Sequence, residues 1–187
     1  MLRQPTLETA RLLLRPFRSA DADRVQQLAG DRAVADTMLK IPHPYEDGMA
    51  EQWIANHRDW FEHRQQAVFA VTLKQGGTLI GALGLRLELD DQRAELGYWI
   101  GKPYWNQGYC TEAARAALQF GFEQLELNRI FAHHFVRNPA SGRVMQKIGM
   151  VYEGRLRQHV KKWGAFEDLE FYGIVKSQWA PPTRHTS

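Results

Sequence analysis

The sequence has little of what marks several common classes of protein. Its only cysteine is Cys110, which excludes an intrachain disulfide and any cysteine-rich zinc site. Its 24 basic and 21 acidic residues leave a net charge of only +3. The basic residues are also scattered, so the sequence pI of about 9.1 does not indicate a nucleic-acid-binding surface. We therefore expect no nucleic-acid partner.

Long apolar runs are missing too. No stretch approaches the roughly 20 residues that cross a bilayer. The N-terminal segment MLRQPTLETARLLLRP lacks the apolar core of a signal peptide, and a single cysteine suits a reducing compartment. The sequence therefore predicts a cytoplasmic protein with no membrane partner.

What the sequence does contain is enough for one folded core. Hydrophobic residues make up 44% and charged residues 24% of the 187 residues, close to the average of globular proteins. This length is typical of one domain. We expect a single domain over residues 1–179 and a flexible tail over 180–187, where Ala-Pro-Pro-Thr-Arg-His-Thr-Ser has nothing to pack against.

Hydrophobic periodicity and turn residues predict the order of strands and helices. In the first hundred residues the predicted elements are a strand at 11–18, a helix from Ser19, one long helix between 46 and 66, and a meander of strands at 68–74, 78–89 and 93–100. In the remainder they are a helix at 111–125, a strand at 129–136, a short helix at 139–148, and strands at about 151–161 and 166–176. Asn138 and Gly149 bound the short helix, because Asn is a preferred N-cap and Gly a preferred C-cap.

The segment from Glu95 to Glu112 carries the clearest functional signal. It passes from a strand to a helix through Gly108, and such a turn exposes unpaired backbone N–H groups at the positive end of a helix dipole. These donors favour a phosphate group, although a plain strand-to-helix turn with a packing glycine is the alternative. The segment is not a P-loop, because Gly97 to Lys102 is one residue short of the required spacing and Pro103 stands where Ser or Thr should bind magnesium. With no GxGxxG fingerprint either, the loop does not indicate an NTPase or a dehydrogenase.

Four motifs in the right order extend this signal. They are Glu95-Leu-Gly-Tyr-Trp-Ile, Trp105-Asn-Gln-Gly-Tyr-Cys-Thr-Glu-Ala, Asn138-Pro-Ala-Ser and Lys147-Ile-Gly-Met-Val-Tyr-Glu-Gly. Together they resemble the GNAT acetyltransferase superfamily. The opening Leu7-Glu-Thr-Ala-Arg-Leu-Leu-Leu-Arg15 is similar to that of its RimJ/RimL-like branch, which includes enzymes that acetylate ribosomal-protein N-termini. The resemblance covers residues 7 to 179.

The resemblance implies a fold and an activity. The fold is an α/β (α+β) domain, with a mixed, mostly antiparallel sheet of six or seven strands, helices on both faces, and a V-shaped splay between the strands at 93–100 and 129–136. The activity is transfer of an acetyl group from acetyl-CoA to a primary amine, such as a protein N-terminal α-amine, by direct attack in a ternary complex. A small-molecule amine acceptor, an antibiotic or a polyamine, is the closest alternative. A CoA-binding sensor without turnover is a third, and the protein is expected to be a monomer or homodimer.

The family pattern also implies the residues that bind acetyl-CoA. Backbone N–H groups of the glycine loop would hold the pyrophosphate, the main chain of the preceding strand would pair with the pantetheine arm, and an amide on the short helix would grip that arm. These residues are, in turn, Gln107, Gly108, Tyr109, Cys110 and Thr111; Tyr98, Trp99 and Ile100; and Asn138, with Ser141 near the sulfur. A plain N-cap is the alternative for Asn138. Cys110 is expected to pack rather than to act as a nucleophile.

Proton transfer is where the chain departs from its relatives. Many carry a tyrosine on the short helix, where this chain has Met145, which cannot donate a proton. Ser141 matches a serine of the RimL-like branch and is the candidate acid, with a helix-start serine as the alternative. Glu95 is the candidate base, and a surface carboxylate is its alternative. His159 lies near the position of the branch's glutamate, but Val160 stands at the matching place. Tyr172 could orient the substrate or assist the acid, or simply pack in the core.

The remaining candidates concern metal and acceptor. His133-His134 resembles a metal pair, but neighbours in a strand point to opposite faces, so we expect no metal. The helical region before residue 67 and the loop at about 162–166 are expected to select the acceptor. The aromatic residues Trp53, Trp60 and Phe61 of that region could shape a groove, although packing on the core is the expected role.

Overall fold

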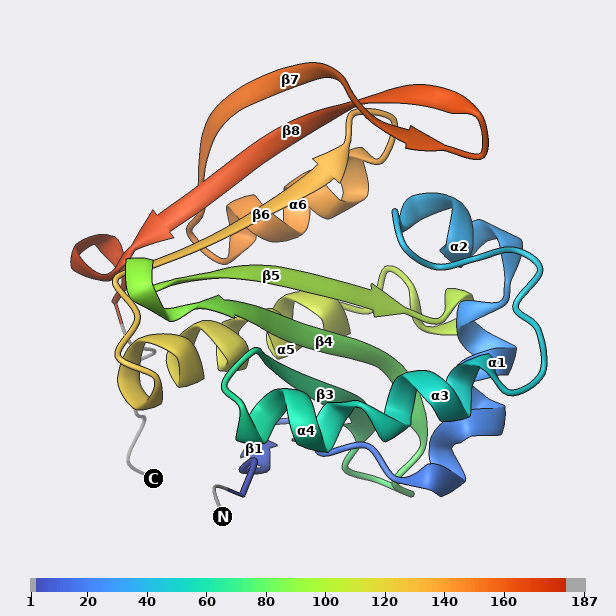
Figure 1. The fold of residues 1–187 in the computed structure, drawn as a ribbon. Coiled ribbons are helices and arrows are strands. Elements are labelled where there is room, and N and C mark those ends of the chain that lie inside the picture. Colours follow the sequence, from blue (N-terminus) through green and yellow to red (C-terminus); the bar gives the residue numbers. More distant parts are fainter. Residues whose placement is uncertain (1–2, 181–187) are drawn as a thin grey trace.

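A single mixed sheet forms the centre of the computed structural model, which describes residues 3–180 (Figure 1). The predicted tail at 180–187 lies outside the described residues except for Ala180. Within them the sheet has eight strands in the order β1-β2-β3-β4-β5-β6-β8-β7. The strands are β1 Leu7–Glu8, β2 Leu12–Arg15, β3 Gln66–Leu73, β4 Leu79–Glu88, β5 Arg93–Ile100, β6 Arg129–Phe135, β7 Val151–Lys162 and β8 Ala165–Val175. Every neighbouring pair is antiparallel except β5 and β6.

The mixed, mostly antiparallel sheet is confirmed, but six or seven strands was too few. The additional strand is β1, whose two residues pair with Leu13 and Leu14 of β2. A two-residue strand is too short to give a periodic pattern, so sequence reasoning could not find it.

Helices cover both faces of the sheet, as predicted (Figure 1). They are α1 Ala22–Ala29, α2 Arg32–Thr37, α3 Met49–Ala55, α4 His57–Glu62, α5 Tyr109–Gln119 and α6 Pro139–Lys147. The predicted single helix between 46 and 66 is in fact two. It breaks at Asn56, whose side-chain amide donates to the Gln52 carbonyl at 2.6 Å and so competes with the backbone pattern. The short helix α2 was not predicted. No helix within residues 3–180 is long and apolar enough to cross a bilayer.

Two hydrophobic clusters fix the helices on their faces. Ala94, Leu96 and Ile100 of β5 pack with α5 on one face. Trp99, which lies between Leu96 and Ile100 on the same strand and points the opposite way, packs with α1 and α3 on the other face. This alternation assigns each side chain of β5 to a face, because successive residues of a strand point to opposite sides. Below, the first is called the α5 face and the second the α3 face.

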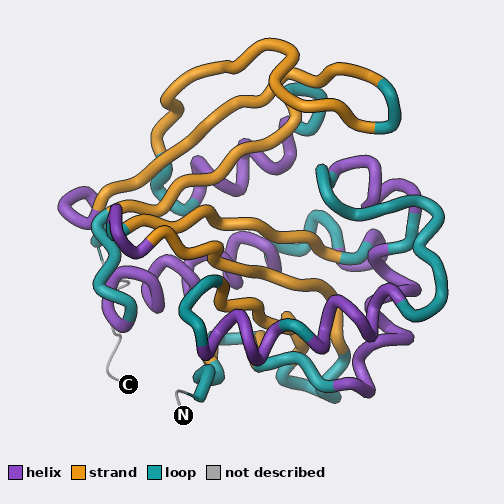
Figure 2. The backbone as a smooth tube through the Cα atoms, viewed as in Figure 1, coloured by secondary structure: helices purple, strands orange, loops and turns teal. Residues whose placement is uncertain are grey.

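The splay between β5 and β6 is the feature that positions the site. The two strands pair in parallel only at Arg93 with Arg129, Ala94 with Ile130, and Glu95 with Phe131. Beyond that point they diverge, which the strand tubes show in Figure 2. The edge of β5 from residue 96 to 100 therefore has no strand partner toward β6, while its other edge pairs with β4. The V-shaped opening expected between these two strands is confirmed.

Candidate active site

The glycine loop lies at the wide end of the splay, where β5 leads into α5. Gly108 is the N-cap of α5 and has a φ of +79°, a left-handed conformation that favours glycine. No side chain caps the start of this helix. The first backbone N–H groups of a helix have no partner within the helix, so here they are available to an anion.

Arg11, the residue before β2, supports this loop. Its Nη1 donates to the Gln107 carbonyl at 3.0 Å, its Nε donates to Glu112 Oε2 at 2.7 Å, and its guanidinium carbon lies 4.5 Å from the centre of the Tyr109 ring. Thr9 also donates to Glu112, at 2.6 Å. Burial would raise the pKa of Glu112, but these hydrogen bonds from Thr9 and Arg11 outweigh it and lower that pKa. Sequence reasoning missed this clamp, because nothing local links residues about a hundred positions apart.

A hydrogen bond crosses from β5 to α6 on the α5 face. The hydroxyl of Tyr98 lies 2.9 Å from Ser141 Oγ and donates to the Ser141 carbonyl at 3.1 Å. Burial raises the pKa of Tyr98 far above its usual value, so the phenol keeps its proton. The structure therefore brings the candidate acid Ser141 together with a second hydroxyl. The sequence assigned Tyr98 only a main-chain role, so this contact of its side chain is new.

Three further candidates differ in burial and hydrogen bonding. Met145 is almost completely buried and belongs to the core. Burial raises the pKa of the Cys110 thiol to about 12, which leaves very little of the reactive thiolate at neutral pH. Asn138 precedes α6, yet its side chain makes no capping hydrogen bond. The N-cap alternative therefore does not occupy the Asn138 amide.

The α3 face carries the candidate base. Glu95 accepts a hydrogen bond from Arg86 of β4 through Oε2, and its Oε1 lies 3.3 Å from His133 Nδ1 of β6. Next to Glu95, the same face has room, because a Cβ built on Gly97 would have no atom within 4 Å. A carboxylate and an imidazole thus stand beside open space where the two strands separate. His133 was considered in the sequence only as half of a metal pair.

Tyr172, His159 and His134 contact other side chains of the sheet and of α6. Tyr172 is buried on the α5 face, where its ring centre lies 5.7 Å from that of His134 and its hydroxyl 3.4 Å from Gln146 Nε2. The centre of the His159 ring lies 6.1 Å from that of the Phe171 ring. His134 packs against Gly142 of α6, where a Cβ would come within 2.6 Å of its Nε2.

The adjacent histidines at 133 and 134 face opposite sides of the sheet, as the strand alternation predicts. Among residues 3–180, no three His, Cys, Asp or Glu side chains form a group that could hold a metal ion.

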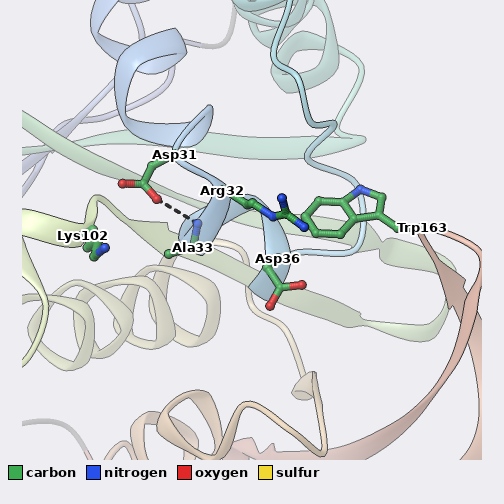
Figure 3. Close-up of a pocket in the computed structure, with 6 residues that line it drawn as sticks. All are labelled: Asp31, Arg32, Ala33, Asp36, Lys102 and Trp163. Carbon is green, nitrogen blue, oxygen red and sulfur yellow. Dashed lines mark hydrogen bonds between the residues drawn. The ribbon is translucent and has the colours of Figure 1, made fainter.

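A hollow of about 490 Å³ lies at the wide end of the splay (Figure 3). Its lining comes from α2, from the loop after β5 and from the turn between β7 and β8: Asp31, Arg32, Ala33, Asp36, Lys102 and Trp163. Its charges are balanced, with two acids and two bases. Arg137 ties the rim together, since it donates to Asp36 at 2.7 Å and to Glu167 of β8 at 2.8 Å.

The predicted aromatic residues lie elsewhere. Phe61 is buried in the core. Trp53 and Trp60 pack against His57, with ring centres 4.3 and 5.5 Å from it. None of the three lines the hollow.

Comparison with known proteins agrees with this geometry. The family model described as "Acetyltransferase (GNAT) domain" matches residues 11–151. The chain is 30% identical over 176 residues to the "Uncharacterized N-acetyltransferase p20" of Bacillus licheniformis, covering 94% of this chain and 98% of that protein. It is 32% identical over 102 residues to the "Ribosomal-protein-serine acetyltransferase" of Escherichia coli, covering 54% of this chain and 57% of that protein.

A solved GNAT-family acetyltransferase from Bacillus anthracis has the same fold, with a TM-score of 0.83, 26% identity, and coverage of 92% of this chain and 99% of that one. The chain therefore belongs to the GNAT superfamily, in its RimJ/RimL-like branch, and is an acetyl-CoA-dependent N-acetyltransferase.

Proposed function

We propose that this protein transfers the acetyl group of acetyl-CoA to a protein N-terminal α-amine, by direct attack in a ternary complex. The observation that carries the proposal is the splay itself. An unpaired strand edge leads to an uncapped helix start, with a hydroxyl pair on one face of the sheet and a carboxylate on the other. No covalent enzyme intermediate is needed. Cys110 is not suited to form one, because burial raises its pKa to about 12 and keeps the thiol protonated at neutral pH.

The residues fit an acetyl-CoA molecule along this edge. The main chain of Tyr98, Trp99 and Ile100 runs along this edge and would pair with the pantetheine arm, as in peptide addition to a sheet edge. The Ile100 carbonyl already accepts a hydrogen bond from Trp105 Nε1 at 2.6 Å, so the groups of Tyr98 and the Ile100 N–H would serve the arm. The N–H groups from residue 107 to 111 would hold the pyrophosphate. The uncommitted amide of Asn138 would bind the arm from the α6 side. When bound, acetyl-CoA supplies the thioester that the amine attacks.

The proposal gives separate faces to the two proton transfers. Ser141 would protonate the leaving thiolate from the α5 face, because its hydroxyl shares a hydrogen bond with Tyr98, which keeps its own proton. Glu95 would serve proton removal from the amine on the α3 face, beside the open space at Gly97. Tyr172 touches Gln146 of α6, so its contribution would be to the placement of that helix.

The lining of the hollow favours a single amine over a polyamine. Asp31 and Asp36 are offset by Arg32 and Lys102, so the opening lacks the acidic excess that would hold several positive charges. Trp163 is 47% exposed there and offers an apolar surface to a residue near the reacting amine. A peptide with one α-amine and an apolar neighbour meets both conditions.

Thiol release from acetyl-CoA, measured with a panel of peptides and small amines, tests this proposal. We expect peptides with a free α-amine to be the best acceptors and the same peptides with a blocked N-terminus to be inert. Faster turnover with spermidine or an aminoglycoside would reassign the acceptor class. Tight CoA binding in calorimetry with no turnover on any acceptor would instead support a sensor.

A further inference from the structure

We propose that His133 is the general base of the reaction and that Glu95 acts through it as a positioning residue. This inference rests on the proposed function and concerns the atom that accepts the amine proton. It starts from a side chain to which the family motifs assign no role. His133 lies on β6, two residues after the last position at which β6 pairs with β5.

The position of His133 is set by the strand register. Glu95 pairs with Phe131, and paired residues of parallel strands point to the same face, so His133 also points to the α3 face. On β5 the residue two positions after Glu95 is Gly97, as His133 is two positions after Phe131 on β6. Gly97 has open space where a side chain would be. His133 therefore stands across the mouth of the splay from the space through which an amine could approach.

The contacts of the imidazole distinguish its two nitrogens. Nδ1 is enclosed, has no formed hydrogen bond, and lies 3.3 Å from Glu95 Oε1. Of the two ring nitrogens, Nδ1 is the one that is buried without a hydrogen-bond partner within residues 3–180, and Nε2 is not. A carboxylate facing Nδ1 favours the tautomer with the proton on Nδ1, which leaves the lone pair on Nε2. Hydrogen bonds of this kind are often long before substrate binds.

Glu95 is less suited to accept the proton itself. Its Oε2 is already the acceptor for the Arg86 guanidinium, and its Oε1 faces His133. Both carboxylate oxygens are therefore directed at neighbouring side chains. The His133 imidazole, which faces Glu95 through Nδ1, is the better placed base at this point of the α3 face.

The charge state of His133 agrees with this role. Burial lowers its pKa first, and the charges of His159, Arg86 and His134 lower it further, while Glu95 opposes them; the net effect lowers the pKa from its usual value. These residues come from β7, β4, β6 and β5, and the ring of Phe171 on β8 completes the surroundings at 5.2 Å. The imidazole is therefore neutral at pH 7 and ready to accept a proton.

The proton and electron balance is simple. The amine nitrogen bonds to the thioester carbon, and His133 Nε2 takes a proton from the resulting ammonium. The C–S bond then breaks with its electron pair on sulfur, and Ser141 gives a proton to the thiolate. Solvent water carries the proton from the imidazolium back to the Ser141 oxygen, and Tyr98 keeps its own proton throughout. Amide and CoA thiol are formed, and no oxidant, reductant or metal is consumed.

Kinetics of His133→Gln test the role directly. We expect kcat to fall by on the order of 100-fold or more, the usual contribution of a general base, with little change in CoA affinity. In the wild-type protein kcat should decline at low pH with an apparent pKa below 6.5, and this limb should be absent from the variant. Glu95→Gln should lower kcat by a smaller factor. His159→Gln removes an exposed histidine near the same Phe171 ring and is the control. It should keep the wild-type kcat where His133 is neutral, while the apparent pKa of kcat rises, because the His159 charge lowers the pKa of His133.

Two further measurements guard against a misfolded variant. Nitrogen NMR shifts of the wild-type protein report the tautomer without any substitution, and we expect the proton on Nδ1 of His133. External imidazole should restore part of the activity of His133→Ala.

The outcomes separate the two proposals. If the wild-type protein turns over and His133→Gln keeps its kcat and pH profile, the role of His133 is overturned and the acetyl transfer stands. The opposite tautomer of His133 has the same consequence. No thiol release from the wild-type protein with any acceptor overturns both.

Discussion

Lowering the pH from 7 to 4 should destabilise this protein through His57 in particular. His57 is the first residue of α4 and is only 5% exposed. Its ring is surrounded by those of Phe17, Trp53 and Trp60, with centre distances of 5.1, 4.3 and 5.5 Å. Neither ring nitrogen has a hydrogen-bond partner. A protonated imidazole here would carry a positive charge with no acceptor for its N–H groups.

The magnitude follows from the pKa difference between the folded and unfolded states. Burial lowers the pKa of His57 from 6.5 to about 4. Between those values the unfolded chain binds the proton and the folded protein does not, so stability falls as the pH falls through this window. At about 1.4 kcal/mol for each pKa unit, the loss between pH 7 and pH 4 is about 3 kcal/mol. That is a large share of the 5–15 kcal/mol typical of folded proteins.

Denaturant unfolding of the wild-type protein and of His57→Phe, at pH 7 and pH 4, measures this contribution. The variant keeps an aromatic ring among the other three but cannot take up a proton. Asp21 and Glu112 also have lowered pKa values, so both proteins lose some stability in acid, and only the difference between them belongs to His57. We expect the wild-type protein to lose about 3 kcal/mol more than the variant over this range. Equal losses in the two proteins would refute the reasoning.

Three other predictions concern the proposed site. Gly108→Val should weaken CoA binding in calorimetry, because a β-branched residue is strained at a φ of +79° and its side chain would enter the phosphate seat; unchanged affinity would remove that seat from the loop. Ser141→Ala should lower kcat by on the order of 100-fold while CoA affinity stays within a few-fold, and unaltered turnover would mean that water or Tyr98 protonates the thiolate. Cys110→Ala should keep both turnover and CoA binding, and the wild-type thiol should react slowly with alkylating reagents at pH 7, since burial raises its pKa to about 12. Rapid, inactivating alkylation of Cys110 would contradict that prediction.

The sequence was a good guide wherever a feature depends on local pattern. The strand at 93–100, the glycine at 108 and the short helix bounded by Asn138 and Gly149 all depend on neighbouring residues in the chain, and all are present. The break at Asn56 was missed because the local pattern does not show it. Hydrophobic periodicity continues through it, whereas the side-chain bond from Asn56 to the Gln52 carbonyl marks the end of α3.

The contacts that complete the candidate site could not be predicted in the same way. Tyr98 meets Ser141 across 43 residues, and His133 meets Glu95 through the register of two parallel strands. Such contacts depend on how strands pair and where they separate, and a single sequence carries no local signal for either. The residue types were visible in the sequence, but their partners were not.

The Arg11 clamp has a consequence for how the protein assembles. The seat proposed for the pyrophosphate is formed by residues 107 to 111, yet its support comes from the Arg11 side chain, 96 positions before Gln107. Closing a loop of that length is slow compared with forming α5, so the helix start would exist before it is held in place. Affinity for CoA should thus appear late in refolding, when β2 docks onto the sheet. Binding of the nucleotide end of the co-substrate would therefore show that the whole domain has folded.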